Sequence, residues 1–192
     1  MRKSIRPLLL LAAASLALSA CSKQADEQPS ADASAGTQAL KPSSKSLPDT
    51  LDDADGLQTV AEALKETGIG SALKGKGSYT LLAPEDDAFA RLGEAGKALT
   101  QSDDHAALAA LLKAHLLPGY VTPQDIGAAI DASKDRQVSM ASLSGQVLRF
   151  TRAEGGKIAV TAADGSTATL DGNPVAGGAS IAIPINGVLK KV

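Results

Sequence analysis

The chain has 192 residues and one cysteine, and its formal net charge is −5 from Cys21 onward, because 16 basic and 21 acidic residues follow the first 20 positions. This mild acidity, with no cluster of Lys and Arg, argues against a nucleic-acid-binding protein. A single cysteine excludes an internal disulfide, and aromatic residues make up only 2% of the chain, so aliphatic side chains must form the core.

The N-terminus has the pattern of an export signal. Three basic residues precede the apolar run 8–18, which is followed by Leu18-Ser19-Ala20-Cys21. A run of 11 residues is too short to span a bilayer, which takes about 20. The sequence predicts a signal peptide over residues 1–20, cleaved between Ala20 and Cys21. A cysteine at this position is typical of bacterial lipoproteins, in which the thiol accepts diacylglycerol and the new amine is acylated.

Lipidation of Cys21 makes the membrane the first expected partner, because two or more acyl chains give stable attachment. The alternative is an ordinary export signal with a free cysteine nearby. Ser22 stands where an Asp would signal retention in the inner membrane, so the outer membrane is expected if the source is Gram-negative. The sequence leaves open whether the domain faces the periplasm or the outside.

A change in composition divides the remaining chain. Residues 21–46 are rich in Ser, Ala, Pro and Gln and contain a single leucine, Leu40. Such a segment buries too little apolar surface to fold, so we expect a disordered tether that starts at the lipidated cysteine. Residues 47–192 are long enough for one domain with its own core.

The first half of this domain has mainly helical patterns. Apolar residues recur at helical spacing from Leu57, and Pro118-Gly119 and Thr122-Pro123 mark a helix stop and a helix start. The expected elements are a helix from Leu57 that stops at Gly68, a strand over 78–83, a helix that begins at Pro84 and carries Leu92, a helix over 103–116 capped by Ser102, and a helix over 123–130.

The second half has the pattern of short strands separated by turns that contain glycine. The expected strands cover 138–141, 146–151, 157–161, 166–170, 181–185 and 188–192. Helices followed by strands indicate an α+β domain with a largely antiparallel sheet.

Three segments resemble the signature blocks of fasciclin domains. They are 79–89, 112–119 and 185–189, and the matching residues are Thr80, Ala83, Pro84, Ala88, Phe89, His115, Pro118, Gly119, Asn186, Val188 and Leu189. The resemblance implies a fasciclin-like fold, in which N-terminal helices pack on a β-sheet or sandwich wedge. It also implies a non-catalytic role in adhesion or in contacts with envelope proteins or polysaccharides.

The last block admits two registers. A gapless alignment from the end places Ala179-Ser180, Ile183 and Asn186 on the family's Asn-Gly, His and Asp. The other register places Asn186-Gly187-Val188 on the family's Asn-Gly-Val and truncates the last strand. We prefer the first, because a missing final strand would open a sheet edge. Ala114 replaces the family's Tyr, and this change and Ile183 make the adhesive activity mapped to those motifs doubtful.

No catalytic or metal-binding constellation stands out, so we expect no enzyme, no cofactor and no metal. His115 shares a stripe with leucines, which predicts a buried, neutral, hydrogen-bonded ring; an enzyme would have to use it. The other motif residues are expected to build the fold. A second functional hypothesis is a periplasmic carrier that holds a small ligand between helices and sheet. The sequence does not indicate an oligomeric state.

Overall fold

The computed structural model describes residues 44–101 and 105–191. The predicted signal peptide, Cys21, Ser22 and all but the last residues of the expected tether lie outside this range, as do Ser102 and Val192.

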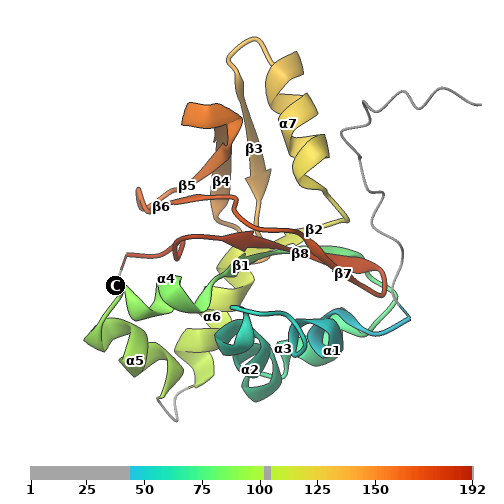
Figure 1. Ribbon diagram of the computed structural model, residues 1–192, viewed down its shortest axis with the longest axis vertical. Coiled ribbons are helices and arrows are strands. Elements are labelled where there is room, and N and C mark those ends of the chain that lie inside the picture. Colours follow the sequence, from blue (N-terminus) through green and yellow to red (C-terminus); the bar gives the residue numbers. More distant parts are fainter. Residues whose placement is uncertain (1–43, 102–104, 192) are drawn as a thin grey trace, which may run out of the picture. The chain divides into compact units, whose positions relative to one another are not determined.

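Two four-stranded sheets form the framework of the described unit (Figure 1). The first has the order β2 (Leu116–Pro118), β1 (Tyr79–Pro84), β8 (Ser180–Ile185) and β7 (Val175–Gly177). The second has the order β3 (Gln137–Ala141), β4 (Val147–Arg152), β5 (Ile158–Ala162) and β6 (Thr167–Thr169). All pairings are antiparallel except β1 with β8, so the α+β fold with largely antiparallel sheets is confirmed.

Six helices lie on one side of the first sheet, and a seventh packs on the second sheet (Figure 1). The six are α1 (Leu47–Leu51), α2 (Gln58–Glu66), α3 (Ile69–Leu73), α4 (Asp86–Ala90), α5 (Glu94–Thr100) and α6 (His105–His115). The seventh is α7 (Pro123–Ala132), and a short 3-10 turn, η1 (Glu154–Gly156), joins β4 to β5.

The first sheet separates two hydrophobic cores. Side chains alternate along a strand, so Leu81 and Ala83 of β1 join the core under the six helices, whereas Leu82 joins the core under α7. Strand β8 alternates in the same way, with Ala182 on one side and Ile183 on the other. Every residue of β8 is buried, as expected of a strand covered on both faces.

Helix α7 shows how local sequence fixes an element. The side chain of Thr122 accepts a hydrogen bond from the N–H of Asp125 (3.1 Å), and the Asp125 carboxylate accepts one from the N–H of Thr122 (2.9 Å). This capping box, with Pro123 in the first turn, satisfies N–H groups that have no partner within the helix. The predicted helix over 123–130 is confirmed and extends to Ala132.

The helix expected to begin at Pro84 was placed wrongly. Pro84 is the last residue of β1, where it pairs with Ile185. Glu85 is still extended and donates its N–H to the carbonyl of Ile185 (3.0 Å), and the helix starts only at Asp86. The helix ends at Ala90, so Leu92 lies beyond it. A proline favours an extended residue before it but does not oblige a helix after it.

The predicted strand over 188–192 is also wrong for the described residues 188–191, which form no strand. The segment is instead held by packing and by side chains. Val188 and Leu189 are buried, and the N–H of Lys191 donates to Asp164 Oδ2 (2.8 Å). The chain turns at Asn186 and Gly187, so β8 is the last strand within the described residues.

The other strands of the second half are confirmed within one or two residues. Five helices and strands of the described chain carried no sequence prediction: α1, α3, α5, β7, and β2, which begins at Leu116 where the expected helix was to end. All five are short, and short elements contain too few residues to show a period.

Candidate functional site

The motif residues of the first and second blocks meet inside the protein. The Oγ1 of Thr80 donates to the carbonyl of Gly119 (2.8 Å) and accepts from the N–H of Val121 (2.8 Å). Gly119 has a φ of +92°, a conformation that favours glycine, and its N–H donates to the carbonyl of Ser78 (2.8 Å). This network joins the chain after β2 to the start of β1.

The remaining motif residues also serve packing. Asn186 Oδ1 accepts from the N–H of Thr169 (2.8 Å), which fixes the end of β8 beside β6. Of the other motif residues, those that are buried are Ala83, Pro84, Ala88, Phe89, Val188 and Leu189, whereas Pro118 is exposed. A buried side chain has no surface to offer a partner, so these positions build the fold.

His115 is fully buried, and both of its ring nitrogens are hydrogen-bonded. The N–H of Leu189 donates to Nε2 (2.9 Å), so Nε2 carries no proton and Nδ1 donates to the carbonyl of Leu111 (2.8 Å). Burial lowers the pKa of His115 to about 4, despite the opposing effect of the Leu111 carbonyl. The ring is therefore neutral at pH 7, and neither nitrogen is left for a metal or a substrate.

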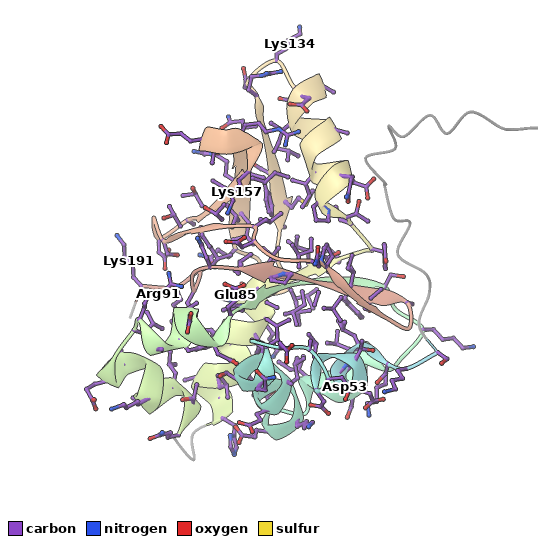
Figure 2. The ribbon with its side chains drawn as sticks, in the orientation of Figure 1. Asp53, Glu85, Arg91, Lys134, Lys157 and Lys191 are labelled. Atoms are coloured by element: carbon purple, nitrogen blue, oxygen red, sulfur yellow. The ribbon has the colours of Figure 1, made fainter. Side chains whose placement is uncertain are left out.

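A groove of about 550 Å³ lies between α7 and the segments around β5 and 170–172. We call it the α7–β5 groove. Lys157, one of its lining residues, lies on the side of the first sheet away from α2 and α4 (Figure 2). The groove is lined by Pro123, Gln124, Gly127, Ala128, Asp131, Arg152, Gly156, Lys157, Ile158, Leu170, Asp171, Gly172 and Ile183.

The apolar part of the groove consists of aliphatic side chains. Ile158, Leu170 and Ile183 are almost fully buried members of the second core, so they form a fixed floor. On the α7 wall, Gly127 and Ala128 present at most a methyl group. The aliphatic floor can bind an apolar group, and the small residues of the wall allow this group to lie close to α7.

One ion pair lines the groove on the α7 side. Arg152 Nη2 donates to Asp131 Oδ2 (2.6 Å), Nε donates to Oδ1 (3.3 Å), and Nη1 donates to the carbonyl of Gly156 (3.1 Å). The hydrogen bond from Arg152 holds the pKa of Asp131 below its ordinary value. A Cβ on Gly127 would lie 2.8 Å from Arg152 Nη2, so the glycine makes room for the guanidinium.

A second ion pair lines the other side. Lys157 Nζ lies 3.3 Å from both carboxylate oxygens of Asp171. The N–H of Gly172 also donates to Asp171 Oδ1 (3.0 Å), and this bond, followed by the lysine, lowers the pKa of Asp171. Both pairs are partly open to solvent, with side chains 36–54% exposed.

None of the four charged residues was a candidate in the sequence, because the partners lie 21 and 14 residues apart in the chain. One signal was present. Gly127 stands inside a helix, where glycine costs about 1 kcal/mol relative to alanine and often marks a close approach.

Two further findings concern the described residues only. Within 44–101 and 105–191, no group of three or more His, Cys, Asp and Glu side chains is arranged to hold a metal ion. In the same part of the chain, no helix combines the length and the apolar character needed to cross a membrane.

Comparison with known proteins identifies the class. The family model described as Fasciclin domain matches residues 55–188, so the chain belongs to the fasciclin-domain family. Fasciclin domains are adhesion and binding modules and are typically non-catalytic.

Two relatives show how far the likeness extends. Protein sll1483 of Synechocystis sp. is 31% identical over 115 residues, which cover 59% of this chain and 58% of that protein. A FAS1 domain pair from the insect cell adhesion molecule fasciclin I has the same fold, with a TM-score of 0.65 and 15% identity over 77% of this chain and 51% of that chain. The chain thus spans less than two thirds of either relative.

Proposed function

We propose that this protein is a lipoprotein of the bacterial envelope, held by acyl chains on Cys21, whose fasciclin domain binds a protein or polysaccharide partner without catalysis. The observation that carries the proposal is the α7–β5 groove, which combines a buried aliphatic floor with two solvent-accessible ion pairs. The family motif residues are mostly buried, so they leave recognition to other surfaces.

Membrane attachment rests on the signal pattern that ends at Cys21. The described chain begins beside β7, where a methyl group on Gly177 would overlap the backbone of Leu47. A tether over 21–46 would therefore join the domain at this edge of the first sheet. Ser22 favours delivery to the outer membrane of a Gram-negative cell, with the domain in the periplasm or outside.

Membrane fractionation with mass spectrometry of the mature N-terminus tests the anchor, with wild type compared to Cys21→Ser. A diacylglyceryl adduct on Cys21 in the outer-membrane fraction is expected, and the variant should be soluble and folded. An unmodified wild-type protein in the soluble fraction would disprove anchored display.

Site-specific photo-crosslinking in cells tests the groove. A benzophenone amino acid at Ala128 lies in the groove, whereas the same residue at Ala132 is exposed on the last turn of α7 and lies outside the groove. Adducts of higher mass are expected from position 128 and not from position 132. Equal adducts from both positions would show that the groove is not the binding surface.

The groove volume favours a second candidate, a periplasmic carrier for a small ligand, since small-molecule sites are typically about 300–1,000 Å³. Native mass spectrometry of protein purified from cells separates the two. A constant added mass below about 1 kDa that disappears in Ala128→Trp would favour the carrier. Protein of unmodified mass, together with crosslinked macromolecular adducts, would favour the binding module.

A further inference from the structure

The lining of the α7–β5 groove restricts the chemistry of its occupant, and the following inference rests on the proposed function of this groove. All of its large apolar side chains are aliphatic, and its lining contains no aromatic residue. Proteins commonly hold sugar rings against aromatic faces, so this floor suits a branched aliphatic group better than a sugar.

The charges of the groove favour an occupant that carries both signs. Each side holds one basic and one acidic group, Arg152 with Asp131 and Lys157 with Asp171. A polymer of a single sign, such as an acidic polysaccharide, would be repelled by one member of each pair. Exposed ion pairs contribute about 0–1 kcal/mol, so their members can exchange partners at little cost when a ligand brings charges of its own.

The order of the strands places Arg152 and Asp171, one member of each ion pair, on either side of Ile158. Arg152 on β4 is the register partner of Ile158 on β5, and the N–H of Leu170 donates to the carbonyl of Ile158 (2.8 Å) on the other side. Asp171 follows Leu170 directly. The backbones of Arg152 and Asp171 are therefore about two strand spacings, or about 10 Å, apart, and Lys157, directly before Ile158, reaches Asp171 from the middle strand.

This spacing matches an extended polypeptide. Alternate side chains of an extended chain point to the same face about 7 Å apart, and long charged side chains adapt their reach by a few ångströms. Ala128, whose side chain is a single methyl group, leaves room for the backbone of such a chain beside α7.

We propose that the α7–β5 groove binds an extended peptide segment of a partner protein. The segment presents one branched aliphatic side chain to Ile158, Leu170 and Ile183. Within two positions on either side of this side chain, the segment carries one positive and one negative residue. One of them pairs with Arg152 or Asp131 at one end of the groove, and the other pairs with Lys157 or Asp171 at the other end.

Selection from a random library of phage-displayed 12-residue peptides, against the full-length chain in detergent, tests the proposal. The selected peptides should share an aliphatic residue flanked by opposite charges. By fluorescence polarisation, Ala128→Trp should weaken their binding at least about tenfold, and Ala132→Trp should change it by less than about twofold. Circular dichroism verifies that both variants fold.

A charge exchange supplies an independent readout. Asp131→Arg with Arg152→Asp keeps a pair of opposite charges but reverses their positions, so selection against it should return peptides with the opposite charge order. An unchanged order, or peptides that bind Ala128→Trp as tightly as wild type, would overturn the proposal.

Palmitate, dextran oligomers and alginate oligomers serve as competing probes. If one of them binds in a way that Ala128→Trp abolishes while no peptide does, the peptide proposal is wrong although the groove remains a binding site. Failure of the groove itself would be evident from the photo-crosslinking at Ala128 and Ala132.

Discussion

The ring of His115 accepts a hydrogen bond from the backbone N–H of Leu189, 74 residues further along the chain, at 2.9 Å. This contact fixes the segment after β8, which no strand holds. It depends on a neutral ring, because a protonated Nε2 is a donor and would face another donor.

Stability should therefore fall with acidity over a defined range. The pKa of His115 is about 4 in the folded protein and near 6.5 in the unfolded chain, so the unfolded state takes up the proton first. The stabilisation is complete above pH 6.5 and is lost as the pH falls toward 4, by about 3 kcal/mol between pH 7 and pH 4. Urea unfolding at several pH values measures this loss.

The His115→Gln variant is the control, since carboxylates of depressed pKa, such as Asp125 and Asp164, also destabilise the fold in acid. The variant should be less stable at pH 7 but lose less stability on acidification than wild type. An equal loss in both proteins would show that His115 does not contribute to the pH dependence.

Replacing Thr80 by Val should cost about 1–3 kcal/mol, because the N–H of Val121 and the carbonyl of Gly119 would lose their buried partner. Thr167→Val, on the exposed face of β6, should change stability by less than about 0.5 kcal/mol. Chemical denaturation measures both. Equal effects at the two positions would contradict a structural role for the Thr80 hydroxyl.

Leu112 lies on the buried face of α6 and is fully inaccessible. Its replacement by Ala should therefore cost about 2–5 kcal/mol, from lost burial and from the cavity left behind. Lys113→Ala, one position along on the exposed face, should be nearly neutral. A loss below about 0.5 kcal/mol for Leu112→Ala would show that this face is not core.

Gly127→Ala tests whether the Arg152–Asp131 ion pair depends on the space beside Gly127. Alanine favours a helix by about 1 kcal/mol, but its methyl group would displace the Arg152 guanidinium, 2.8 Å away. The pKa of Asp131 should then rise toward its ordinary value, which NMR titration of the carboxylate detects. Arg152→Gln should produce the same rise, and an unchanged pKa in Gly127→Ala would mean that the ion pair tolerates the methyl group.

Sequence patterns predicted the helices and strands correctly where the cause of an element lies within a few residues of it. The capping residues before α7 and the glycine-containing turns of the second sheet act over a few positions, and both gave elements that the structure confirms. The stripe of leucines also predicts a buried, hydrogen-bonded His115, which the structure confirms, but it does not indicate the two partners, Leu111 and Leu189.

The groove could not be predicted from the sequence, because it depends on contacts that no local pattern encodes. Arg152 meets Asp131 because β4 packs beside α7, and Lys157 meets Asp171 because the chain returns past β5 after β6. The strand expected after Gly187 failed for the related reason that apolar residues such as Val188 and Leu189 can be buried by packing alone. Periodicity reports which residues avoid water and leaves open what covers them.

The parallel pairing of β1 with β8 also sets the order in which the protein can fold. Tyr79 donates its N–H to the hydroxyl of Ser180, 101 residues later, and the register continues to Pro84 and Ile185. Contacts this distant raise the contact order and slow folding, because a long loop must close before they form. If the chain is exported as proposed, β1 keeps an open edge until β8 has crossed the membrane, so the domain would complete its fold only after translocation had passed Ile185.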